Sequence, residues 1–212
     1  MVRRYAQGAE VGPRGTSFRV WAPARKKVEL VVDGAHALTR ALQYESNGYF
    51  SIEVDVGVGA LYRYRLDGGD AFPDPASRFQ PEGPHGPSQV VDPSQFAWTT
   101  NAWRCEPLHR HILYETHIGT FTREGTWASA TEALPFLVDI GVTLLEIMPI
   151  AGFPGRFGWG YDGVDWYAPA HIYGTPDDVR RFVDRAHALG LGVILDVVYN
   201  HIGPNGNYLP QY

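Results

Sequence analysis

Two places in the second half of the sequence carry aromatic and polar side chains of the kinds that bind neutral sugars. One follows the apolar run 142–148, and the other lies at the end of the apolar run 193–199. The candidate substrate-binding residues are Trp159, Tyr161, Asp162, Asp196, Asn200 and His201. An aromatic ring can stack on the C–H face of a sugar, and carboxylate, amide and imidazole groups can hydrogen-bond its hydroxyls. These residue types therefore indicate a neutral polyol as ligand.

The elements that must position these side chains alternate between strand-like and helix-like patterns. Apolar runs at 112–117, 142–148 and 193–199 are typical of buried strands, and a stretch of helical periodicity separates each from the next. An alternation of near-continuous apolar strands with helices predicts a parallel sheet covered by helices.

Both predicted helices have local sequence signals. The first covers 126–140, and Pro135 is expected to bend or restart it because proline lacks a backbone N–H. The second is expected to begin after Thr175, a capping residue, with Pro176 in its first turn and Gly190 closing it.

Two parallel folds compete, a doubly wound nucleotide-binding sheet and a (β/α)8 barrel. A nucleotide-binding sheet needs closely spaced glycines after its first strand, and residues 118–121 do not provide them. Barrel enzymes build their sites from side chains at the carboxyl ends of the strands, where the candidate residues lie. The pattern favours the barrel. A complete barrel takes roughly 200–250 residues, so the three strands predict only its first part and a chain that is a piece of something longer.

The first hundred residues have a different pattern. Short alternating runs at 17–22, 28–32, 49–54 and 61–66, separated by turn residues, predict an immunoglobulin-like β-sandwich. The segment 72–110 that follows contains seven of the sixteen prolines. Proline excludes most of it from helix and central strand, so we expect an ordered connector over the surface.

These patterns predict three parts of the chain. Residues 1–98 form a β-sandwich, residues 99–111 a connector, and residues 112–212 the first three strands of an incomplete barrel.

Composition and charge exclude several partners. The formal net charge is −5, so we expect no nucleic acid as partner, because a phosphate-backbone binder needs a basic face. No apolar run approaches the roughly 20 residues of a membrane helix, and no apolar stretch follows Arg3 and Arg4 as in a signal peptide. The single Cys105 fits a reducing cytosol. We therefore predict a cytoplasmic protein without cofactor or metal, and the sequence leaves its oligomeric state open.

Several phrases of the sequence resemble one enzyme family. Residues Asp196–His201 resemble the first conserved region of the α-amylase superfamily, glycoside hydrolase family 13. Within that superfamily, five further phrases resemble the malto-oligosyltrehalose trehalohydrolases: 62–67, 74–78, 159–164, 167–169 and 200–209.

The resemblance implies a reaction. Members of this family hydrolyse the α-1,4 bond next to the trehalose end of maltooligosyl trehalose, and their product is trehalose. The retaining mechanism uses one carboxylate as nucleophile and a second carboxyl as acid/base. In the superfamily these groups follow the fourth and fifth barrel strands, and a third Asp follows the seventh. The resemblance therefore implies no catalytic residue in this chain, a nucleophile and an acid/base beyond Tyr212, and an inactive protein when the chain is alone.

The resemblance also implies roles for three of the candidate residues. Tyr161 corresponds to the aromatic residue that stacks on the sugar before the cleaved bond, and His201 to the histidine that hydrogen-bonds the same sugar. Asp196 corresponds to an aspartate that supports an Arg absent from this chain. Trp159 is a further possible sugar contact, whereas Asp162 and Asn200 are equally well explained as turn and loop residues.

Two other functions remain open. A 1,4-α-glucan branching or debranching enzyme of the same superfamily has the same layout. Branching enzymes, however, typically have Gln at the position of Asp162 and a Trp-Val-Pro phrase in place of residues 197–199. The other is a non-catalytic glycan-binding fragment.

Overall fold

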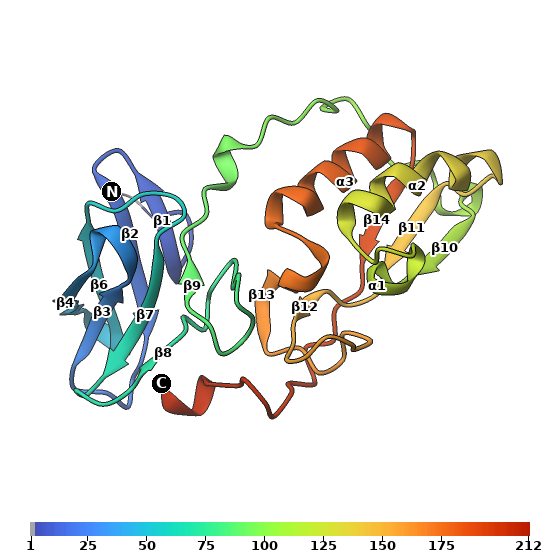
Figure 1. Ribbon diagram of the computed structural model, residues 1–212. Coiled ribbons are helices and arrows are strands. Elements are labelled where there is room, and N and C mark those ends of the chain that lie inside the picture. Colours follow the sequence, from blue (N-terminus) through green and yellow to red (C-terminus); the bar gives the residue numbers. More distant parts are fainter. Residues whose placement is uncertain (1–2) are drawn as a thin grey trace.

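The computed structural model describes residues 3–212 and has two parts, as Figure 1 shows. A β-sandwich built from the first strands lies on one side, and a parallel sheet covered by helices lies on the other. Between strands β9 and β10 the chain arches from the sandwich to the far end of the parallel sheet. None of the helices in this part of the chain is long and apolar enough to cross a membrane.

The sandwich has two antiparallel sheets, and the four strands expected from alternation are present. One sheet has the order β1-β2-β6-β5, with β1 Gly8–Gly12, β2 Gly15–Trp21, β6 Tyr49–Val54 and β5 Gln43–Tyr44. The other has the order β4-β3-β7-β8, with β4 Leu38–Ala41, β3 Val28–Val32, β7 Leu61–Leu66 and β8 Ala71–Phe72, and β9 Ser88–Gln89 also pairs with β7.

Inward-facing side chains of both sheets form one core. Phe18 on β2 packs edge-to-face on Tyr62 of β7, with 4.8 Å between ring centroids, and both rings are buried. Edge-to-face aromatic pairs stabilise a core beyond the area that they bury. The predicted β-sandwich is therefore confirmed.

The proline-rich segment differs from the prediction in its first half. We expected all of it over the surface, and residues 91–110 are exposed or half-buried, but most residues between 73 and 90 are buried between the sandwich and the second part of the protein. Asp74, Ser77 and Gln80 are among these buried residues. A buried irregular segment must satisfy its polar groups internally, and this one does so through side-chain hydrogen bonds.

Those hydrogen bonds form a chain that joins the two parts of the protein. The Tyr62 hydroxyl donates to Asp74 Oδ2 (2.7 Å), and the Asp74 backbone N–H donates to Ser88 Oγ (2.9 Å). Ser88 Oγ donates to Gln80 Oε1 (2.9 Å), and Gln80 Nε2 donates to Asp165 Oδ2 (3.3 Å) in the second part. Burial raises the pKa of Asp74 to about 6 and that of Asp165 to about 7.

The last residues of the chain return to the sandwich. Tyr212 belongs to the sandwich core, and its hydroxyl donates to the carbonyl oxygen of Pro73 (2.8 Å). The Tyr208 hydroxyl and His85 Nδ1 are 2.7 Å apart. The segment that follows the parallel sheet is therefore fixed at both of its ends.

The second part is a parallel sheet in the order β10-β11-β14, with β10 Leu113–Thr116, β11 Leu144–Ile147 and β14 Gly192–Leu195. The third strand is shorter than the predicted run 193–199. Its pairing with β11 ends at Ile147 and Leu195, and within residues 3–212 no strand pairs with its other edge. The Asp196 N–H still donates to the Ile147 carbonyl, and after it the chain makes no further pairing with β11. A short antiparallel pair, β12 Ala151–Gly152 and β13 Asp165–Pro169, lies between β11 and the last helix.

Helices α2 (Trp127–Asp139) and α3 (Pro176–Ala188) cover one face of this sheet, and α1 (Ile118–Phe121) is a single turn. Thr175 caps α3 as predicted, and its side chain accepts from the Asp178 N–H (3.3 Å). Pro135 does not restart α2, which stays continuous through it. Single 3₁₀ turns occupy 34–36, 46–48, 93–95, 108–110, 171–173 and 209–211. The strand–helix alternation of an unclosed barrel is therefore confirmed.

We expect the packing of α3 on α2 to stabilise this part of the protein. Phe182 is buried against Trp127, with 5.2 Å between ring centroids, and Phe182→Ala should cost about 3–5 kcal/mol because it leaves a cavity. Phe136→Ala is the matched control, since that ring is 62% exposed on α2. Urea unfolding followed by circular dichroism measures both. Equal losses in the two variants would contradict this packing.

Burial of Asp165 also predicts a pH dependence of the interface. A carboxyl group with a pKa of about 7 in the folded protein keeps its proton where the unfolded chain, with a pKa near 4, has lost it. The free energy of unfolding should therefore fall as the pH rises from about 4 to about 7, by up to about 4 kcal/mol from this group. In Asp165→Asn this part of the decline should disappear. Urea unfolding at several pH values tests it, and an unchanged slope in the variant would refute it.

Candidate functional site

The carboxyl ends of the three parallel strands meet at one edge of the sheet. Thr116, Ile147 and Leu195 occupy neighbouring positions in the register. The Asp196 N–H donates to the Ile147 carbonyl (2.9 Å), which continues this register by one residue. The residues after each strand are therefore brought together, as the barrel prediction requires.

The loop 153–164 between β12 and β13 carries half of the candidate residues, and its backbone is held from two sides. His117 Nε2, after β10, lies 2.9 Å from the carbonyl oxygen of Gly158. The Gly203 N–H, in the segment after β14, donates to the Gly163 carbonyl (3.2 Å). This loop is therefore attached both to the end of β10 and to the segment after β14 that carries His201.

Gly160 fixes the course of this loop. Its φ is +89°, and a Cβ at this position would lie 1.9 Å from the carbonyl oxygen of Pro149. Only a residue without Cβ allows such an approach of two backbone segments. The side chains of Trp159 and Tyr161 consequently leave the loop from a constrained backbone.

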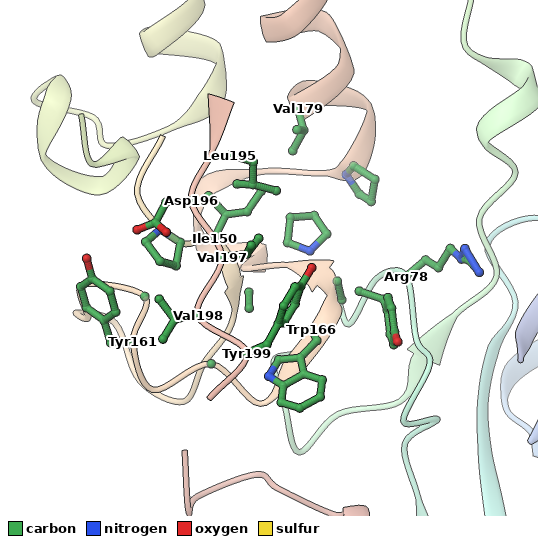
Figure 2. Close-up of a pocket in the computed structure, with 18 of the residues that line it drawn as sticks. Arg78, Ile150, Tyr161, Trp166, Val179, Leu195, Asp196, Val197, Val198 and Tyr199 are labelled. Carbon is green, nitrogen blue, oxygen red and sulfur yellow. The ribbon is translucent and has the colours of Figure 1, made fainter. Parts of the chain in front are cut away.

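Three candidate residues line one cavity of about 270 Å³, which Figure 2 shows. They are Tyr161, Asp196 and His201. In Figure 2, Tyr161 and Asp196 lie on one side of the cavity, and Trp166 and Tyr199 lie on the other. The rings of Trp166 and Tyr199 contact each other edge-to-face at 5.9 Å. Two aromatic surfaces, a carboxylate and an imidazole thus face one space, a set that suits a hydroxylated ring.

The Asp196 carboxylate makes no ion pair and accepts no hydrogen bond from another group within residues 3–212, and it is half-buried. Its oxygens remain free to accept hydrogen bonds.

Part of the same cavity is unsuited to a sugar. Ile150, Val179 and Leu195 form an apolar wall between β14 and α3. Apolar side chains offer no partner to hydroxyl groups, so burying hydroxyls against them would cost free energy. The side of the cavity whose chemistry suits a sugar is therefore the one with Tyr161, Asp196 and His201.

The other three candidate residues face elsewhere. Trp159 lines a second cavity of about 760 Å³, and Asp162 lines a third of about 260 Å³. Asn200 is exposed and lies outside the lining of all three cavities. In the described part of the chain, no three His, Cys, Asp or Glu side chains come together as a metal site requires.

His117 has a structural position, between the loop 153–164 and Tyr173. Its Nε2 lies 3.2 Å from the hydroxyl of Tyr173, and burial raises the pKa of that tyrosine to about 12. Tyr173 therefore stays neutral and His117 holds the loop in place.

Sequence reasoning missed several residues that line these cavities: Phe157, Arg123, Trp166 and Tyr199. Trp166 and Tyr199 lie within runs that look like plain strands, so only three-dimensional proximity identifies them. Phe157 belongs to the same glycine-rich loop as Trp159, and that neighbourhood was the one available signal.

The arrangement defines a class of protein. It has a β-sandwich followed by parallel strand–helix units, with aromatic and polar side chains at the strand ends. Residues 6–93 match the family model Carbohydrate-binding module 48 (Isoamylase N-terminal domain), and residues 89–211 match the model Alpha amylase, catalytic domain. The chain belongs to the alpha-amylase family.

Comparison with individual proteins is more specific. The chain is 48% identical to the malto-oligosyltrehalose trehalohydrolase of Deinococcus radiodurans over 95% of its length, and 47% identical to that of Saccharolobus solfataricus. It covers 33% and 36% of those proteins, so it spans about a third of their length. The resemblance seen in the sequence is thereby confirmed.

Solved structures agree. A Salmonella typhimurium protein assigned as an alpha amylase superimposes with a TM-score of 0.93 at 45% identity, over 98% of this chain and 35% of that one. A pullulanase from Anoxybacillus sp. LM18-11 in complex with maltotetraose superimposes with a TM-score of 0.81 at 26% identity, over 93% and 35% of the two chains.

The approach of Gly160 to Pro149 makes a prediction with a matched control. Gly155 lies in the same loop with the same φ of +89°, but no atom lies within 4 Å of a Cβ placed on it. Gly155→Ala should cost only the backbone strain of about 1–2 kcal/mol, whereas Gly160→Ala should cost more because the loop must move. Thermal unfolding measures both. Equal destabilisation would show that the close approach does not constrain the loop.

Proposed function

We propose that this chain belongs to a glycoside hydrolase that cleaves the α-1,4 bond next to the trehalose end of maltooligosyl trehalose and releases trehalose. The observation that carries the proposal is the cavity in which Tyr161, Asp196 and His201 meet at the carboxyl edge of the parallel sheet. The identity to several malto-oligosyltrehalose trehalohydrolases supports it. The substrate would be maltooligosyl trehalose or a related α-1,4-glucan.

In this proposal the chain binds and orients the substrate. Tyr161 stacks on the sugar ring before the cleaved bond, and His201 donates a hydrogen bond to a hydroxyl of that ring. Asp196 accepts a hydrogen bond beside them. Trp159, Asp162 and Asn200 would contact the substrate further along. The nucleophile and the acid/base would come from the length of the relatives that this chain does not span, so the 212 residues alone should not hydrolyse substrate.

We propose the domain organisation 1–98, 99–111 and 112–212. The end of the matched carbohydrate-binding module at residue 93 and the start of β10 at Leu113 support it. A cytoplasmic location is part of the proposal and rests on the single Cys105.

A branching enzyme is the second candidate, because the chain is also 35% identical to a 1,4-alpha-glucan branching enzyme of Xanthomonas axonopodis. The products distinguish the two, since a branching enzyme makes α-1,6 bonds in amylose and releases no trehalose. A binding role of the sandwich alone has support from its match to a carbohydrate-binding module.

The experiment is a trehalose-release assay on maltotriosyl trehalose, with the protein extended to the length of its relatives. His201→Ala should lower kcat/KM at least about tenfold, because the hydrogen bond to the sugar is lost in the transition state. His109→Ala is the matched control, since His109 is an exposed histidine outside the three cavities. Absence of trehalose from the extended, unaltered protein would refute the proposal, and new α-1,6 bonds in amylose would favour the branching enzyme.

A further inference from the structure

Two Asn-Gly pairs occur in the sequence, Asn47–Gly48 and Asn205–Gly206. Asparagine is one of the chemically labile side chains, and a following glycine favours attack on its amide, because no Cβ hinders the approach of the glycine nitrogen. The reaction needs rotation of the peptide bond plane between the two residues. It therefore depends on how firmly the structure holds each pair.

The Asn205–Gly206 pair is loosely held. Asn205 is exposed, and within residues 3–212 neither residue of the pair makes a hydrogen bond. The nearest hydrogen bonds lie on either side, where the Gly203 N–H donates to the Gly163 carbonyl (3.2 Å) and the Leu209 N–H donates to Asn207 Oδ1 (3.1 Å). The turn is fixed at its ends, and no hydrogen bond opposes rotation in its middle.

The Asn47–Gly48 pair is held firmly. The Trp21 Nε1–H donates to the Asn47 carbonyl oxygen (3.0 Å), and the Ala22 N–H donates to the Gly48 carbonyl oxygen (2.9 Å). Gly48 is buried, and a Cβ on it would lie 2.7 Å from the ring of Pro23. Rotation of this peptide bond plane would disturb both hydrogen bonds.

Packing requires the glycine that makes Asn205 labile. Gly206 has a φ of +89°, and a Cβ on it would lie 2.6 Å from the Cβ of Pro84 and 3.3 Å from Val164. A residue with a side chain does not fit there, so the second half of the labile pair is fixed by the fold.

We propose that Asn205 is a site of spontaneous deamidation. The Gly206 backbone nitrogen bonds to the Asn205 Cγ, the Cγ–Nδ2 bond breaks, and the amide leaves as ammonia with the proton of the Gly206 N–H. Water then opens the cyclic imide at one of its two carbonyl groups. The product is an aspartate at position 205 or an isoaspartyl link that runs through the side chain. Water is the one co-reactant, and nothing is oxidised or reduced.

The reaction changes the segment that carries His201. Asn205 lines the same cavity of about 260 Å³ as Asp162, so the product places a second carboxylate there, and like charges repel. The isoaspartyl link also lengthens the main chain between the Gly203–Gly163 hydrogen bond and Tyr208. We expect both products to shift His201 relative to the loop 153–164. The effect on substrate rests on the proposed function, whereas the reaction itself does not.

Peptide mapping by mass spectrometry tests the reaction after incubation of the folded protein in mildly alkaline buffer. Position 205 should convert at least about tenfold faster than position 47, because two hydrogen bonds hold the latter. In denaturant the two positions should convert at similar rates, because both are Asn-Gly pairs. Equal rates in the folded protein, or faster conversion at position 47, would overturn the proposal.

The matched variant is Asn205→Gln, whose longer side chain closes a larger ring and should not convert. Incubation should lower trehalose release by the protein extended to the length of its relatives, in proportion to the converted fraction, and should leave Asn205→Gln unchanged. An equal loss in the variant would refute the effect on the site. No trehalose from the fresh protein would refute the proposed function, and the peptide map would still decide the deamidation.

Discussion

The parallel hydrogen-bond register of β10, β11 and β14 is the constraint on which the site depends. Because Thr116, Ile147 and Leu195 lie at the same level, residues about 80 positions apart in the sequence emerge at one edge of the sheet. Parallel strands need long connections, and here the segments after the strands carry the candidate site residues themselves. The loop 153–164 and the segment after Asp196 are then tied to each other by the Gly203–Gly163 hydrogen bond.

The sandwich contributes to the same arrangement from a distance. Its core holds Tyr212, and His85 contacts Tyr208, so the far end of the segment that carries His201 is anchored outside the parallel sheet. The buried chain of hydrogen bonds from Tyr62 to Asp165 fixes the two parts against each other. Two buried carboxyl groups in this chain make the joint dependent on protonation, because ionising either one leaves a charge in a place with little water.

The features that were predicted correctly from the sequence are those that depend on neighbouring residues. The cap of α3 at Thr175 and the alternation of β2 follow from neighbouring residues, and both are present. The burial of residues 73–90 could not be foreseen, because it depends on contacts with residues as distant as Asp165. The end of β14 at Leu195 could not be predicted either, because it depends on where the pairing with β11 ends. In the site, three of the six candidate residues line one cavity, Tyr161, Asp196 and His201, whereas Trp159 and Asp162 line others, and the sequence did not predict this division. The division of Trp159 and Tyr161 between two cavities depends on the turn at Gly160, which only the approach of Pro149 explains.

That turn also bears on how such a site can change over evolutionary time. Any mutation of Gly160 adds a Cβ that meets the Pro149 carbonyl, so the backbone of the loop is closed to variation at this point. The flanking side chains are under no such restriction, because Phe157, Trp159 and Tyr161 project away from the packed backbone and are exposed. Selection can therefore exchange these aromatic residues one at a time, and with them the surface offered to a ligand, on a loop whose shape stays the same.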